Sequence, residues 1–252
     1  MKIIKNKLSN IGKAKCDCEN LDSLPFIPPF PLPPKNFAIA LIGVPKSGKS
    51  NLLQVLLTSK KTKKSNLYYR GLFDRIEFIS PSSATLPKSF KELLPEERIH
   101  SEYSDILVQD LIDDMYCGPN VNQLIVFDDC IKDINNSRTL SRVFQNRRHC
   151  TQKCDDPDDD ETASLSIMIS SQKFTMIPLE FRNSISDFII FKASAKPEIN
   201  RIIEELMFDL DQKDALHLLN LAWSQPYSFI YIKPLEQLEN KYYIRFDKVV
   251  FD

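Results

Sequence analysis

The stretch NFAIALIGVPKSGKSNLLQVLL, residues 36–57, decides the fold of this chain. Its first part, residues 36–42, is an apolar run that predicts a buried strand, and the apolar spacing of residues 51–57 predicts a helix. Between them, residues 43–50 match the pattern G-x-x-x-x-G-K-[ST] of a phosphate-binding loop, or Walker A motif. The chain has five glycines, and two of them fill the fixed glycine positions. A strand, this loop and a helix in succession predict a nucleotide-binding α/β protein.

The spacing within the loop indicates what each residue type does. Two glycines let the backbone turn tightly, so that successive N–H groups face a phosphate at the start of a helix, where the helix dipole also favours an anion. Lys49 is predicted to contact the β- and γ-phosphates of ATP, and Ser50 to bind Mg²⁺. Pro45 has no N–H, so its neighbours must form the cradle. The predicted phosphate-binding residues are Gly43, Val44, Pro45, Lys46, Ser47, Gly48, Lys49, Ser50 and Asn51.

Length and composition limit the remaining function classes. A chain of 252 residues with 42% hydrophobic and 27% charged residues can form one large α/β domain with extensions. The net charge of −1 provides no overall basic field, so any nucleic-acid surface must be local. No apolar run approaches the roughly 20 residues of a membrane span, and the basic N-terminus has no apolar region typical of a secretory signal. Six cysteines without such a signal favour reduced thiols.

The chain divides into an arm and a catalytic domain. Residues 1–35 are expected to form a basic, proline-rich N-terminal arm, with six prolines in residues 25–34. This arm is either a stiff linker or a segment that packs on its own domain or on a neighbouring subunit. Residues 36–252 are expected to form the P-loop domain, with helices and strands at 196–252. Six acids among residues 155–161 predict a solvated insertion at about 150–163.

Strands and helices alternate after residue 36, which is typical of an α/β fold. The expected strands are 73–80, 123–127, 164–170, 187–191, 227–232 and 242–251, and the expected helices are 105–116, 137–148 and 197–221, the last as one or two helices.

Acidic and amide side chains follow two of these strands. Asp128 and Asp129 come directly after an apolar strand, which resembles a Walker B motif. In that motif, the first acid holds Mg²⁺ through water and the second polarises the attacking water. Gln172 ends the next strand and is predicted to sense the γ-phosphate or to orient the water.

Two basic clusters are expected at the strand ends nearest ATP and are candidates for stabilising the charge that develops during phosphoryl transfer. They are Arg147-Arg148-His149 and Arg182-Asn183, and we predict catalytic roles for Arg148 and Arg182. In ring ATPases one such arginine reaches into the neighbouring subunit's site. The sequence does not decide which arginine does so here.

Taken in order, these elements resemble the genome-packaging ATPases of large eukaryotic DNA viruses and virophages, the poxvirus-type branch of the FtsK–HerA superfamily. The resemblance covers residues 36 to about 250. Its specificity comes from the Arg147-Arg148-His149, Ser171-Gln172 and Arg182-Asn183 elements in sequence, because the Walker motifs belong to many families. Two departures are the acidic insertion between the first and second of these elements, and the proline-rich arm, which has no functional match.

The resemblance implies a RecA-like P-loop NTPase core with a mostly parallel central sheet flanked by helices. It also implies a homo-oligomeric ring that pumps double-stranded DNA with Mg-ATP hydrolysis, a capsid or portal-like vertex protein as partner, and a location in the host cell cytoplasm or virus factory. Two alternatives stay open. One is a P-loop kinase of nucleotides or small molecules, although no arginine-rich lid stands out. The other is a non-motor assembly NTPase, against which the retention of Lys49, Asp128 and Asp129 argues.

Overall fold

The computed structural model describes residues 1–5, 27–59, 68–86, 88–117, 122–134, 137–147 and 165–251. The acidic insertion predicted at about 150–163 and most of the arm predicted at 1–35 lie outside these residues. Within the described residues, no helix is long and apolar enough to span a membrane.

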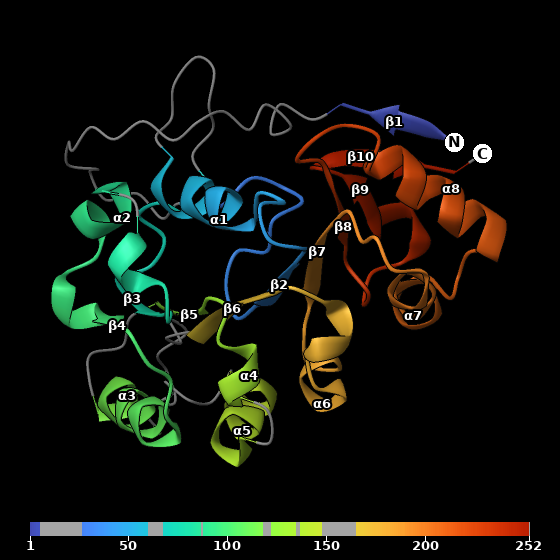
Figure 1. Ribbon diagram of the computed structural model, residues 1–252. Helices are drawn as coiled ribbons and strands as arrows, with labels where there is room; N and C mark the ends of the chain where they lie inside the picture. The colour runs from blue at the N-terminus through green and yellow to red at the C-terminus, as the bar shows by residue number, and fades with distance from the viewer. Residues whose placement is uncertain are drawn as a thin grey trace, which may run out of the picture.

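One sheet of ten strands runs through the described part of the chain, in the order β1-β10-β9-β8-β7-β2-β6-β5-β3-β4 (Figure 1). The six strands from β7 to β4 are parallel, and the four from β8 to β1 continue the sheet antiparallel. The expected α/β class with a mostly parallel central sheet is confirmed. The strands are β1 (Lys2–Ile4), β2 (Ala38–Ile42), β3 (Arg75–Ile79), β4 (Ile99–His100), β5 (Gln123–Phe127), β6 (Leu165–Ser171), β7 (Asp187–Phe191), β8 (Phe229–Ile232), β9 (Tyr242–Ile244) and β10 (Asp247–Val250).

Helices cover both faces of the sheet (Figure 1). Helices α1 and α2 pack on one face, and α3 to α8 on the other. The helices are α1 (Lys49–Thr58), α2 (Lys88–Leu93), α3 (Asp105–Cys117), α4 (Ile131–Ile134), α5 (Arg138–Asn146), α6 (Leu179–Arg182), α7 (Lys196–Leu206) and α8 (Gln212–Ala222).

The sequence of β2 explains its central place. All five of its residues are buried, and they alternate between the two hydrophobic cores: Ala38, Ala40 and Ile42 face one, Ile39 and Leu41 the other. A strand that is apolar on both faces is stable only between two helical layers. Its neighbours β6 and β7 run parallel to it, so the carboxyl ends of all three strands meet at one edge. Open α/β sheets bind their ligands at this edge.

The described part of the proline-rich arm packs on its own domain. The hydroxyl of Tyr231 donates to the Pro31 carbonyl over 3.2 Å, and the hydroxyl of Tyr69 donates to the Pro33 carbonyl over 3.2 Å. The ring of Phe30 contacts that of Tyr243, with centroids 5.9 Å apart. A free linker is therefore excluded for this segment.

Several elements differ from the sequence predictions. The predicted strand 242–251 is wrong as a single strand, because the chain reverses at Arg245, which has a φ of 58° and separates β9 from β10. Strand β1 was not predicted and adds to the sheet beside β10. Helix α2 and strand β4 were not predicted either, because residues 81–100 contain few apolar side chains.

Candidate functional site

The loop after β2 is anchored to the end of β6. The N–H of Gly43 donates to the carbonyl of Ser171 over 3.0 Å, and the N–H of Ser47 donates to the carbonyl of Val44 over 3.1 Å. Lys46 has a φ of 65° and Gly48 a φ of 110°, both in the left-handed region. These turns bring the backbone directly into the first turn of α1.

Glycine is required at both fixed positions for different reasons. A Cβ at Gly43 would lie 2.6 Å from the Oγ of Ser47 and 2.8 Å from the Cβ of Phe191. At Gly48, the φ of 110° is one that other residues rarely adopt. The hydroxyl of Ser47 is buried and has no hydrogen-bond partner among the described residues. The loop thus closes tightly around a polar interior.

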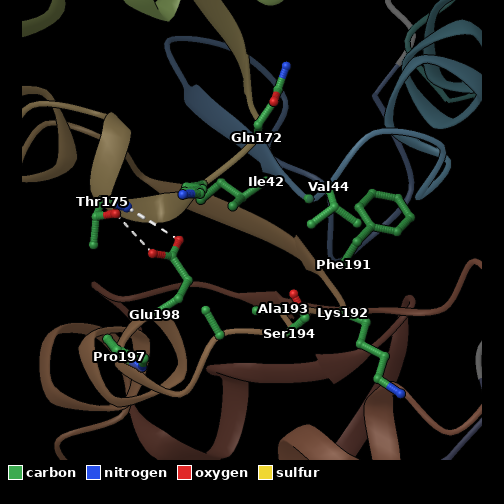
Figure 2. A pocket seen from close by; sticks show the side chains of 13 residues that line it. Ile42, Val44, Gln172, Thr175, Phe191, Lys192, Ala193, Ser194, Pro197 and Glu198 are labelled. Atoms are coloured by element: carbon green, nitrogen blue, oxygen red, sulfur yellow. Dashed lines mark hydrogen bonds between the residues drawn. The ribbon is translucent and has the colours of Figure 1, made fainter.

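Several predicted phosphate-binding residues expose their side chains at this edge: Val44, Pro45, Lys46, Ser50 and Asn51. A cavity of about 310 Å³ opens beside the loop, between the ends of β2, β6 and β7 and the start of α7 (Figure 2). Figure 2 shows Glu198 turned toward Thr175, which donates to it over 2.9 Å, so this carboxylate is held within the wall of the cavity.

Lys49 lies at the start of α1, between the loop and the acids. Its ammonium donates to the carbonyls of Gly43 and Val44, the second over 3.3 Å. Burial lowers the pKa of Lys49, while the negative charges of Asp129 and Asp128 act in the opposite direction. The ammonium therefore faces both acids across the mouth of the loop.

Asp128 follows β5 and is almost fully buried, with 9% of its surface exposed. The hydroxyl of Ser170 donates to its Oδ1 over 2.6 Å, and the Oγ of Ser80 lies 3.5 Å from its Oδ2. Burial raises the pKa of Asp128, and the negative charge of Asp129 adds to this, whereas the hydrogen bond from Ser170 and the charge of Lys49 oppose it. Burial is thus the main reason why the ionised form of this carboxyl is disfavoured.

Asp129 is held in a left-handed conformation, with a φ of 58°. Its N–H donates to the Oγ of Ser170 over 3.0 Å. The amide of Gln172 donates to both of its carboxylate oxygens, over 3.3 and 3.2 Å. The predicted residues Lys49, Asp128, Asp129 and Gln172 therefore come together at one edge of the sheet.

Arg182 and Arg147, the described arginines of the two basic clusters, bind groups other than these four residues. Arg182 makes a paired contact with Glu205, over 2.8 and 2.9 Å, and its guanidinium lies 4.8 Å from the ring centre of Phe174. Arg147 donates to the carbonyl of Asn36 over 3.0 Å, at the amino end of β2 and therefore opposite the loop. The prediction that this cluster lies at the strand ends nearest ATP is wrong for Arg147. Arg148 lies outside the described residues.

Ser170 is a site residue that the sequence analysis missed. It joins Asp128 to the backbone of Asp129, and it is buried, with 2% of its surface exposed. Two adjacent serines at the end of an otherwise apolar strand were the available signal, because buried hydroxyls need partners.

Protein-family models give no match to the chain, and curated protein sequences give none. Solved structures do match. The DNA-packaging ATPase from Sulfolobus Turreted Icosahedral Virus has a TM-score of 0.54 at 12% identity, over 83% of this chain and 97% of that one. The chain has the fold of this packaging ATPase.

The genome packaging NTPase from Sulfolobus turreted icosahedral virus 2 is similar in two complexes. With sulfate it has a TM-score of 0.53 at 12% identity, over 84% of this chain and 96% of that one. With ATP-gammaS the TM-score is 0.51 at 13% identity, over 83% and 96%. These likenesses confirm the fold that the family resemblance implied.

Proposed function

We propose that this chain is an ATPase that drives double-stranded DNA into a preformed capsid, working as a ring of identical subunits. The observation that carries the proposal is the meeting of Lys49, Asp128, Asp129 and Gln172 beside a phosphate-binding loop. A cation, two acids and an amide at one sheet edge match what ATP hydrolysis needs in a P-loop protein.

The donor set fits Mg²⁺. Ser50 offers a hydroxyl and Asp128 a carboxylate, and Mg²⁺ prefers such oxygen ligands while keeping several waters. Burial raises the pKa of Asp128, and a nearby cation would favour its ionised form. When bound, Mg²⁺ would neutralise charge on the phosphate oxygens.

Each residue then has a defined task. Lys49 exchanges the carbonyls of Gly43 and Val44 for phosphate oxygens when ATP binds, because a phosphate is the stronger partner for an ammonium. Asp129 accepts a proton from the attacking water, or polarises it, as a general base. Gln172 holds the Asp129 carboxylate in place until the γ-phosphate offers its amide a better acceptor.

The fold is the reason why the proposal includes DNA and a ring of subunits. The solved structures of this fold include a DNA-packaging ATPase and a genome packaging NTPase from viruses. The net charge of −1 requires a local DNA surface. Arg182 is bound to Glu205 and Arg147 to backbone carbonyls within their own chain, so we assign the arginine in trans to Arg148 of a neighbouring subunit. A capsid or vertex protein as partner, and the host cytoplasm or virus factory as location, belong to the same proposal.

Steady-state ATP hydrolysis with and without linear double-stranded DNA tests this function. We expect DNA to stimulate turnover, Lys49→Ala to abolish nucleotide binding, and Asp129→Asn to bind ATP without hydrolysing it. Gel filtration with and without ATP reports ring formation.

The alternatives give other results in the same experiments. Phosphate transfer from ATP to a nucleoside monophosphate would indicate a kinase. Hydrolysis indifferent to DNA would favour an assembly NTPase. Normal turnover in Asp129→Asn would show that the second acid has been assigned the wrong role.

A further inference from the structure

A strained tyrosine lies against the phosphate-binding loop. Residues 225–228 form a turn in which the N–H of Ser228 donates to the carbonyl of Gln225 over 3.2 Å. Pro226 is second in this turn and Tyr227 third, with a φ of 58°. The third position of such a turn favours glycine or asparagine, and a left-handed conformation costs another residue about 1–2 kcal/mol. A tyrosine at this position therefore destabilises the turn relative to a glycine.

The ring of Tyr227 touches the loop while staying open to solvent. Its Cδ1 lies 3.3 Å from the position that a Cβ would take at Gly48, and 68% of the residue is exposed. Phe191 closes the other side of Gly48, with its Cε1 3.4 Å from the same position. An exposed aromatic ring, that of Tyr227, therefore lies directly beside Gly48, the residue that precedes Lys49.

Backbone strain gathers at the same edge of the sheet. Of the five non-glycine residues with positive φ in the described part, four lie there: Lys46 in the loop, Asp129 after β5, Tyr227 before β8, and Arg245 after β9. Arg245 is on this edge because its N–H donates to the carbonyl of Phe229, which pairs with the last residue of β7. Strained residues of this kind concentrate at ligand-binding sites.

We propose that Tyr227 is the platform on which the base of the bound nucleotide stacks. The inference rests on the proposed nucleotide site, because the exposed ring of Tyr227 lies beside Gly48, within the loop that would hold the phosphates. Stacking is tolerant of base identity because every base has a π-face. Tyr227 thus contributes affinity for a nucleoside triphosphate, with little discrimination between adenine and guanine.

A ligand that has phosphates but no base distinguishes base stacking on Tyr227 from phosphate binding by the loop. Isothermal titration with Mg²⁺ compares ATP with inorganic tripolyphosphate for Tyr227→Phe, Tyr227→Gly and Lys49→Ala. Tyr227→Gly removes the ring and relieves the strain, so the fold is retained. Phe208→Ala is the matched control, because this equally exposed aromatic (71%) lies beyond the end of α7.

We expect Tyr227→Gly to weaken ATP binding by roughly 5- to 150-fold, the range that the loss of one base–aromatic stack gives. Tripolyphosphate binding stays unchanged, and Tyr227→Phe and Phe208→Ala behave as wild type. Unchanged ATP affinity in Tyr227→Gly overturns the inference, as does an equal loss for both ligands, which would make Tyr227 a residue that shapes the loop. Wild-type protein that binds neither ligand overturns the nucleotide site itself, and this inference with it.

Discussion

We expect the loss of the Ser170 hydroxyl to destabilise the protein strongly. This hydroxyl donates to the buried Asp128 carboxylate over 2.6 Å and accepts the Asp129 N–H over 3.0 Å. A hydrogen bond to a charged group contributes about 1.5–3 kcal/mol, and an unmet N–H adds to the loss. We therefore expect Ser170→Ala to destabilise the protein by about 2–4 kcal/mol.

Ser166 provides a matched control on the same strand. It is fully buried, yet its hydroxyl has no hydrogen-bond partner among the described residues. Ser166→Ala therefore removes a buried polar group without breaking a hydrogen bond, and we expect it to be neutral or stabilising. Urea unfolding at neutral pH compares the two variants, since both lose the same oxygen from β6.

A second readout links Ser170 to catalysis. Its hydrogen bond favours the ionised form of Asp128, so removing it raises the pKa of Asp128 further. We expect the acidic limb of the pH profile of kcat/KM for ATP hydrolysis to move to higher pH in Ser170→Ala. Equal stability of the two serine variants within about 0.5 kcal/mol, together with an unmoved acidic limb, would refute the reasoning.

Three further predictions concern the loop, the first acid and the buried arginine. Gly43→Ala places a Cβ 2.6 Å from the Oγ of Ser47, and we expect ATP binding by calorimetry to fall at least tenfold while the circular dichroism spectrum stays native. Burial raises the pKa of Asp128, so the stability that this group provides below its ordinary pKa is lost as pH rises through the raised value. Asp128→Asn should therefore raise the melting temperature of nucleotide-free protein at pH 8, more than at pH 4, and abolish Mg²⁺-dependent hydrolysis. Glu205→Ala should destabilise the protein by about 2–4 kcal/mol in urea, because it leaves the Arg182 guanidinium without its acidic partner. Arg182→Ala should destabilise the protein by less, because Glu205 keeps its ion pair with Arg201 over 2.9 Å. Normal stability in Arg182→Ala with lost turnover would instead favour a catalytic arginine.

The loop and the two acids could be predicted because their chemistry is local. Gly43, Gly48 and Lys49 must have a fixed spacing to surround a phosphate, and Asp128 and Asp129 follow an apolar strand that ends where they begin. The neighbouring strands of the sheet were recognisable for the same reason: residues buried on both faces form continuous apolar runs.

Ser170 and Arg182 could not be assigned in this way because their roles depend on register and on distant partners. Strand β5 pairs with β6 so that Phe127 lies opposite Ile169, which brings Ser170 beside Asp128. Nothing in the sequence sets that register. The partner of Arg182 is 23 residues further along, on α7. A basic residue after a strand therefore resembles a catalytic arginine until the fold shows which acid binds it.

The carboxyl end of β6, which lies between β2 and β5, contacts both the phosphate-binding loop and the two acids. Its last residue accepts the Gly43 N–H at the start of the loop, and Ser170 just before it bridges both acids. Gln172 just after it holds the second acid. Three consecutive residues, 170–172, thus connect the phosphate-binding loop with Asp128 and Asp129. If Gln172 turns toward a γ-phosphate, as the proposed function requires, the contacts of the two serines behind it should change as well, because packed interiors do not deform continuously. In the function that we propose, this strand end therefore links the γ-phosphate to both the loop and the two acids.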